Sequence, residues 1–270
     1  MAFQSPLLNV MHQAVRKASR GLVRDFGEVE KLQVSRKGPG DFVSLADKKA
    51  EEVLKESLAQ ARPKFGFLCE ESQPIVGEDP ERRWIIDPLD GTTNFLHGIP
   101  FFAVSVALEE KGQITAAVVA LPALDEVFHA EKGQGAYLNN QRIRVSGRRN
   151  IEDALLATGI PHMGRSHSAE FMSDLAYFSP RVSGIRRFGA AAMDLAYVAA
   201  GRCDGFWERG LAPWDIAGGI LLVKEAGGYI STTDGQANPM ESGDILATND
   251  HLQGKILRML KESRGTRVNV

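Results

Sequence analysis

The sequence predicts a layered α/β fold in which helices pack against β-sheets. Three observations support this prediction. Apolar residues recur at helical spacing near the N-terminus, short β-rich runs fill the middle of the chain, and strands alternate with helices in the second half. With 270 residues, of which 43% are hydrophobic, the chain can bury a large core. We expect one domain over residues 1–270, with halves at approximately 1–146 and 150–270.

Helices are expected first along the chain. Apolar side chains in residues 7–23 fall near helical spacing, and the segment Gly38-Pro39-Gly40 then interrupts the chain. A second helix is expected over residues 47–61, because its apolar residues share one face and Pro63 follows.

Strands dominate the middle of the chain. They are short and rich in β-branched and aromatic residues, and they are expected over residues 65–68, 84–87, 102–108, 114–121 and 126–130. Glu110-Lys111-Gly112 is typical of a hairpin turn, and residues 133–135 predict another turn. The polar and basic residues 142–150 are the best candidate boundary between the halves.

Strands and helices alternate after this boundary. Strands are expected over residues 154–158, 182–186, 205–208, 229–232 and 244–248. Helices are expected over residues 189–200, 213–226 and 252–260. This interleaving predicts layers of helix on sheet.

The composition excludes several classes of protein. The net charge of −2 lacks the basic excess of a dedicated nucleic-acid binder. Residues 1–20 do not resemble a signal peptide, and the longest apolar stretch, residues 114–124, is too short to span a bilayer. Cys69 and Cys203 are interpreted as reduced thiols of a cytoplasmic protein. The histidines are scattered and do not have zinc-site spacing.

Candidate chemistry centres on residues 87–92, Asp-Pro-Leu-Asp-Gly-Thr. An apolar strand is expected to end at Asp87, and Asp90 follows three residues later, so both carboxylates can converge on one ion. Hard oxygen ligands of this kind suit Mg²⁺, which keeps several waters and meets substrate phosphate directly. Gly91 and Thr92 are expected to open a short helix whose backbone N–H groups can bind an anion. Alone, this segment could equally be a plain turn with Asp90 as a helix cap.

Other acidic residues are ambiguous when each is taken singly. Glu70 and Glu71 follow a short apolar stretch and could be solvated loop residues. Asp215 could simply be an acid in the first turn of a helix, where the helix dipole favours it, and Asp47 could cap the second expected helix.

Together these segments resemble the inositol monophosphatase family, and the resemblance covers nearly the whole chain. The matching segments are residues 41–47, Glu70-Glu71-Ser72, residues 87–92, residues 135–146, Gly189-Ala190-Ala191 and residues 214–228. The resemblance implies a layered αβαβα sandwich of the sugar-phosphatase type and a homodimer.

The resemblance also implies a set of metal ligands. Glu70, Asp87 and the carbonyl of Leu89 would hold a first Mg²⁺, and Asp87, Asp90 and Asp215 would hold a second. Glu70 would also contact a weaker third ion through water, so that it counts as catalytic as well as metal-binding.

The remaining roles that the resemblance implies concern phosphate, water and alcohol. Gly91 and Thr92 would bind phosphate through backbone N–H groups. Asp47 would hydrogen-bond Thr92, and this pair would orient the attacking water. Ala191 and Glu208 match positions that face the substrate alcohol.

The implied function is Mg²⁺-dependent hydrolysis of a small phosphorylated polyol, with inositol 1-phosphate as the leading substrate and lithium as an inhibitor. Rival substrates within the family are those of fructose-1,6-bisphosphatase, histidinol phosphatase and nucleoside 3′,5′-bisphosphate phosphatase. A rival of another class is a regulatory partner of a transcription complex, for which Arg186 or Arg187 would be a candidate surface. Three departures from the family pattern stand near the site: Cys69, where glycine is common, Ser44, where threonine is common, and Ala190, where a hydroxyl residue is common.

Overall fold

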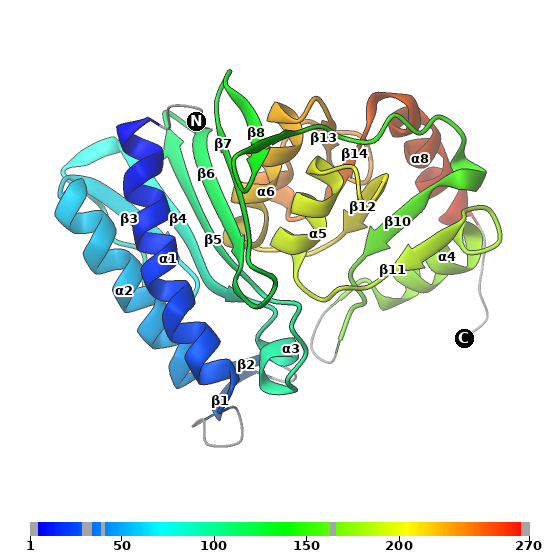
Figure 1. Cartoon of the computed structure of the whole chain (residues 1–270). Helices are drawn as coiled ribbons and strands as arrows, with labels where there is room; N and C mark the ends of the chain where they lie inside the picture. Colours follow the sequence, from blue (N-terminus) through cyan, green and yellow to red (C-terminus); the bar gives the residue numbers. More distant parts are fainter. Residues whose placement is uncertain (1–4, 29–33, 39–40, 163–165, 266–270) are drawn as a thin grey trace.

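The computed structural model describes residues 5–28, 34–38, 41–162 and 166–265, and these form five layers (Figure 1). The two outermost layers are helical, a further pair of helices fills the centre, and the sheets lie between. This αβαβα arrangement is the one expected.

The larger sheet has seven strands in chain order. Its strands are β3 (Phe65–Cys69), β4 (Asp79–Asp90), β5 (Ala103–Glu110), β6 (Gln113–Leu121), β7 (Glu126–Glu131), β8 (Gly135–Leu138) and β9 (Gln141–Ile143). β3 pairs with β4 in parallel, and every later neighbour pairs antiparallel. One face of this sheet is covered by α1 (Pro6–Phe26) and α2 (Leu45–Ala61). A small hairpin, β1 (Val34–Gly38) and β2 (Asp41–Ser44), leads into α2.

The smaller sheet has five strands in the order β11-β10-β12-β14-β13. These strands are β10 (Leu155–Thr158), β11 (Gly184–Arg186), β12 (Gly205–Glu208), β13 (Tyr229–Ser231) and β14 (Ile245–Thr248). The central layer consists of α5 (Ala191–Ala199) and α6 (Pro213–Glu225), and the far layer of α4 (Ser168–Phe178) and α8 (Asp250–Ser263). Two short α-helices, α3 (Thr92–Leu96) and α7 (Pro239–Ser242), and two 3₁₀ helices, Pro122–Leu124 and Ile151–Asp153, complete the described elements.

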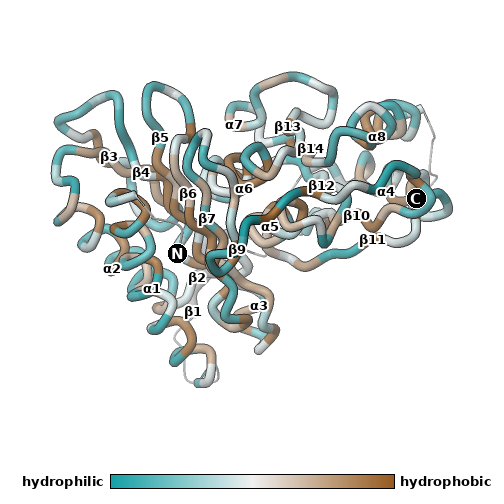
Figure 2. The backbone as a smooth tube through the Cα atoms, turned by 45° about the horizontal axis from the view of Figure 1, so that its top comes forward, coloured by the Kyte–Doolittle hydropathy of each residue, from teal (hydrophilic) through white to brown (hydrophobic). Residues whose placement is uncertain are grey.

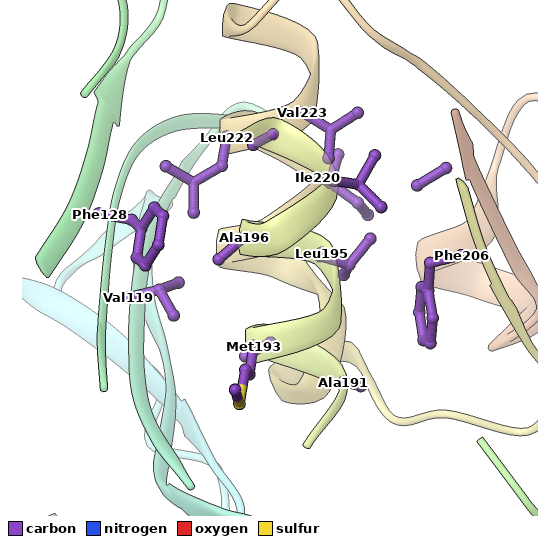
Figure 3. Close-up of a cluster of buried hydrophobic side chains, with 14 of the residues drawn as sticks. Val119, Phe128, Ala191, Met193, Leu195, Ala196, Phe206, Ile220, Leu222 and Val223 are labelled. Atoms are coloured by element: carbon purple, nitrogen blue, oxygen red, sulfur yellow. The ribbon is translucent and has the colours of Figure 1, made fainter. Parts of the chain in front are cut away.

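The main hydrophobic core lies around the central helices. Figure 3 shows Val119 and Phe128 of the larger sheet facing Ala196 of α5, with Phe206 of the smaller sheet on the other side. Along the backbone, hydrophobic residues concentrate in β5, β6, β7 and α5 (Figure 2). Because α5 and α6 are buried against both sheets, they fix the position of one sheet relative to the other.

The segment between the sheets, residues 144–150, is anchored by a buried aspartate. Asp204 accepts hydrogen bonds from Ser146 Oγ at 2.6 Å, Arg148 Nε at 3.0 Å and the backbone N–H of Leu155 at 2.7 Å. Asn249 Nδ2 donates to Ser146 Oγ and to the carbonyl of Arg148, both at 2.9 Å. The proposed boundary is therefore an ordered connection, and the assignment of one domain with two halves stays a prediction.

The structure extends several expected elements and adds others. β4 continues through Asp90 instead of ending at Asp87, and α2 begins at Leu45 with Ser44 as its N-cap. The sequence analysis did not predict β1, β2, β8, β9, α4 or α7. Most are very short, and α4 follows a glycine- and serine-rich stretch that masks its periodicity.

Two further expectations concern the cellular compartment of the protein. Cys69 and Cys203 are both free and buried. Within the described ranges, no helix has the length and apolar character needed to cross a membrane.

The close approach of α5 and α6 generates a stability prediction. A Cβ on Gly219 of α6 would lie 2.4 Å from Leu195 Cβ, so Gly219→Ala should destabilise the protein by about 1–3 kcal/mol through overpacking. Gly254→Ala in α8 is the matched control, because a Cβ there meets nothing within 4 Å. It should stabilise by about 0.5–1 kcal/mol through helix propensity. Denaturant unfolding measures both changes, and equal effects would contradict the assigned packing.

Candidate active site

The site begins where β4 runs into α3. The pairing of β4 with β5 shifts register between Asp87 and Asp90, so the strand bulges there. Within the bulge, Asp87 Oδ1 accepts a hydrogen bond from the N–H of Leu89 at 3.0 Å. Gly91 then has φ +92°, and a Cβ there would lie 2.9 Å from the carbonyl oxygen of Phe101. Glycine is therefore needed at this turn, which starts α3 at Thr92.

Asp47 joins this turn to the start of α2. It is the third helical residue of a capping box, in which its Oδ2 accepts from Ser44 N at 2.8 Å and Ser44 Oγ at 2.5 Å. Its other oxygen, Oδ1, accepts from Thr92 Oγ1 at 3.0 Å. Thr92 Oγ1 also lies 3.1 Å from the carbonyl oxygen of Leu89. The expected contact between Asp47 and Thr92 is present, and Asp47 has a structural role beside it.

Three more carboxylates reach the same place, Glu70 and Asp215 from other elements and Asp90 from the end of β4. Glu70 directly follows β3, and its N–H donates to the carbonyl of Ile86 on β4 at 3.2 Å. Asp215 lies in the first turn of α6, where its Oδ2 accepts from Ala212 N at 2.8 Å. Asp90 accepts a hydrogen bond from the N–H of Ala192 at 2.6 Å and so caps α5 from across the site. The N-cap residue of α5, Ala190, makes no side-chain hydrogen bond of its own.

One cavity of about 130 Å³ brings the expected residues together. Every residue assigned from the sequence lines it except Asp47, which reaches it through Thr92. The lining includes the expected residues Glu70, Asp87, Leu89, Asp90, Gly91, Thr92, Ala191, Glu208 and Asp215. Elements of both sheets and of the central helical layer therefore contribute to a single site.

The electrostatics of this cavity favour a bound cation. Burial, followed by the negative charges of Glu70, Asp90 and Asp215, raises the pKa of Asp87 well above its usual value. Burial and then the charge of Asp215 raise the pKa of Asp90, although the N–H of Ala192 opposes this shift. A hard divalent cation would relieve this repulsion, so the donor set fits such an ion.

The carboxylates do not form a closed metal cage. Across the described residues, no three Asp, Glu, His or Cys side chains are already arranged around one point. Mg²⁺ does not need such a cage, because it is usually held by one or two carboxylates together with water and substrate phosphate. The Leu89 carbonyl is a further oxygen donor at the cavity wall.

Sequence reasoning missed several residues at or behind the cavity. Arg187, which had been grouped with a basic surface stretch, lines this otherwise acidic cavity. Gly159 also lines it, and its local sequence contains no functional signal. Asp194 is buried with its Oδ1 lacking a hydrogen-bond partner among the described residues. Burial raises its pKa, followed by the charges of Glu208 and Asp90. For Asp194, the signal available in the sequence was an aspartate within the alanine-rich segment that forms α5.

The three departures from the family pattern, Cys69, Ser44 and Ala190, are all buried. Burial raises the pKa of the Cys69 thiol to about 12, with the charge of Glu51 adding to the shift. A thiol with this pKa is a poor nucleophile at neutral pH, which favours a packing role. Ala190 lines the cavity beside Gly91, where a hydroxyl is common.

Similarity to known proteins identifies the family of this chain. Residues 4–264 match the model of the inositol monophosphatase family. The chain is 54% identical to an inositol-1-monophosphatase of Mesorhizobium japonicum, over 98% of this chain and 99% of that protein. It is 41% identical to Nus factor SuhB of Escherichia coli, over 95% and 96% of the two chains. The crystal structure of the extragenic suppressor protein suhB from Bartonella henselae superimposes with a TM-score of 0.94, at 56% identity over 96% and 99% of the chains.

The raised pKa of Asp87 predicts how stability depends on pH when a chelator has removed metal ions. Its folded-state pKa lies above the unfolded value, so the folded state holds the extra proton and this carboxyl costs stability as pH rises. Asp87→Asn removes that cost, and its stability relative to wild type should increase as pH rises above the ordinary pKa of an aspartate. One unit of pKa shift corresponds to about 1.4 kcal/mol. Thermal unfolding of both proteins in EDTA measures the difference, and a constant difference would contradict the repulsion.

Proposed function

Because the chain belongs to the inositol monophosphatase family and is a phosphatase, we propose that it hydrolyses inositol 1-phosphate to inositol and phosphate with Mg²⁺. The observation that carries this proposal is the single cavity in which four carboxylate residues, the turn at Gly91 and Thr92, and Glu208 meet. Carboxylates suit the ions, backbone N–H groups suit the phosphate, and a carboxylate can accept hydrogen bonds from alcohol hydroxyls.

Glu70, Asp87 and the Leu89 carbonyl would hold one Mg²⁺, and Asp87, Asp90 and Asp215 a second. Glu70 would also reach a third, weaker ion through water. Bound Mg²⁺ would lower the pKa of a coordinated water and neutralise charge on the phosphoryl group. We also propose that lithium inhibits this phosphatase activity.

Thr92 and Asp47 would orient the attacking water. A hydroxyl that donates its proton to Asp47 Oδ1, at 3.0 Å, retains lone pairs that can accept a proton from water. Burial raises the pKa of Asp47, but the hydrogen bonds from Ser44 and Thr92 favour its ionised form. The N–H groups of Gly91 and Thr92 would hold the phosphate in line with this water.

Glu208 and Ala191 would face the alcohol on the opposite side of the cavity. Fold cannot distinguish inositol from the sugar, histidinol or nucleotide phosphates that other members accept. Inositol 1-phosphate is preferred because the Mesorhizobium japonicum protein that is 54% identical is named for that activity. We further propose that the chain acts in the cytoplasm, in keeping with its free buried cysteines, and as a homodimer.

A second role is supported by a different relative. The 41% identity with Nus factor SuhB favours a role as a partner in a transcription complex. Arg186 and Arg187 are exposed and would provide a surface for such a partner. A binding role does not require catalysis, so phosphate release distinguishes the two functions.

The contact between Asp47 and Thr92 generates a prediction about catalysis. Asp47→Asn should lower kcat by at least about 100-fold, because positioning and proton transfer typically contribute about 10²–10⁴-fold. Ser44→Ala is the matched control, because it removes the cap hydroxyl but leaves Asp47 and Thr92 in place. It should cost about 1 kcal/mol of stability and lower kcat far less than Asp47→Asn does, because the Ser44 N–H still donates to Asp47 Oδ2. Similar kcat values in the two variants would contradict the assigned role of Asp47.

The metal proposal is tested with Asp87→Asn and a substrate panel. Wild type should release phosphate with Mg²⁺ and not in EDTA, fastest from inositol 1-phosphate among inositol, sugar, histidinol and nucleotide phosphates. Asp87→Asn should lower activity by at least about 10³-fold while circular dichroism shows an intact fold. Wild-type rates in that variant would show that the site is misassigned. No turnover on any panel member would favour the binding role.

A further inference from the structure

Glu208 is held at the cavity wall by an unusually close approach of two strand ends. β10 and β12 pair in parallel with Thr158 opposite Trp207, and Thr158 Oγ1 donates to the Trp207 carbonyl at 2.8 Å. Gly159 directly follows the end of β10, and Glu208 is the last residue of β12. A Cβ on Gly159 would lie only 1.9–2.1 Å from the three carboxyl atoms of Glu208. The carboxyl group of Glu208 therefore occupies the space that any other residue at position 159 would fill.

The residue after Glu208 is anchored on the opposite side of the strand. Consecutive strand residues point to opposite faces, and Phe206 packs with the central helices whereas Trp207 packs with α8. Glu208 accordingly faces the cavity and Arg209 faces α4. Arg209 Nη1 lies 2.6 Å from Asp174 Oδ2, and the side chains are only 6% and 0% exposed.

The same aspartate is tied to the end of α8. Ser263 Oγ, on the last residue of α8, donates to Asp174 Oδ1, and Ser263 is also fully buried. The rings of Phe178 and Trp207 stack with centroids 4.8 Å apart, so α4 is packed on β12 as well. Arg209 is thus held by a charged partner that two helices fix in place.

We propose that Arg209, Asp174 and Ser263 are positioning residues for the alcohol, and that Gly159 is a specificity determinant. The buried ion pair fixes the end of β12 on one face, and the bare backbone of Gly159 receives the Glu208 carboxyl on the other. Together they set where Glu208 meets the hydroxyl groups of the substrate. This inference rests on the proposed function, in which Glu208 faces the alcohol.

A positioning role for these residues predicts an effect on substrate preference that a merely structural role does not. Displacing Glu208 should weaken recognition of the alcohol but spare the carboxylates and the Gly91 turn, which lie on other elements. The loss should therefore appear with a polyol phosphate and be absent with p-nitrophenyl phosphate, whose leaving group has no ring hydroxyls.

The test compares Arg209→Lys, Ser263→Ala and Gly159→Ala with wild type on inositol 1-phosphate and p-nitrophenyl phosphate. Arg209→Lys keeps the charge and loses the planar fork. We expect KM for inositol 1-phosphate to rise about tenfold, because misplacement by about 1 Å can cost up to about 100-fold. For kcat, and for kcat/KM on p-nitrophenyl phosphate, we expect values within about twofold of wild type.

Ser146→Ala is the matched control. It removes a serine hydroxyl that donates to the buried Asp204 at 2.6 Å, beside the opposite end of β12. It should lose stability as Ser263→Ala does, yet leave KM for inositol 1-phosphate unchanged. If Arg209→Lys does not fold, Ser263→Ala and Gly159→Ala decide the question.

Equal losses on both substrates, or an unchanged KM in every folded variant, would overturn the positioning role. If inositol 1-phosphate is not the substrate, the result differs, because wild type itself would then hydrolyse p-nitrophenyl phosphate but not inositol 1-phosphate. In that case the same comparison is made with the polyol phosphate that wild type hydrolyses fastest, and the same outcomes decide.

Discussion

The repulsion among carboxylates at the end of β4 is the constraint on which the rest of the structure depends. Asp87 is buried beside Glu70, Asp90 and Asp215, an arrangement that is unfavourable without a cation. Hydrogen bonds from surrounding backbone hold three of these groups in place. The bulge fixes Asp87, the first turn of α6 fixes Asp215, and the N-terminus of α5 fixes Asp90. The repulsion that remains among these carboxylates favours a bound cation.

The local parts of the site were predictable because they are short and contiguous. Residues 87–92 combine a strand, two carboxylates and a helix start within one segment, and the structure retains that order. The capping box at Asp47 is equally local. The strand end was predicted wrongly at Asp87, because a bulge lets pairing resume at Asp90, and no residue type signals that resumption.

The unpredicted parts are contacts between residues far apart in the chain. Asp90 caps a helix that begins about a hundred residues later, and Ala190 provides no cap of its own to suggest this. Gly159 contacts Glu208 only because two short strands lie side by side in the smaller sheet. Arg187 looked like a surface charge because its neighbours are basic. Periodicity and composition contain no information about such pairings.

Assembly of the cavity from both sheets has a consequence for the order in which the chain is made. Glu70 and residues 87–92 leave the ribosome early, whereas Glu208 and Asp215 emerge only after most of the smaller sheet has been synthesised. A growing chain therefore carries the ligands proposed for the first ion before it carries Asp215, which is proposed for the second ion, or Glu208, which is proposed to face the alcohol. The site as proposed is complete only after α6 has docked between the two sheets, so turnover at this site would report a nearly finished chain.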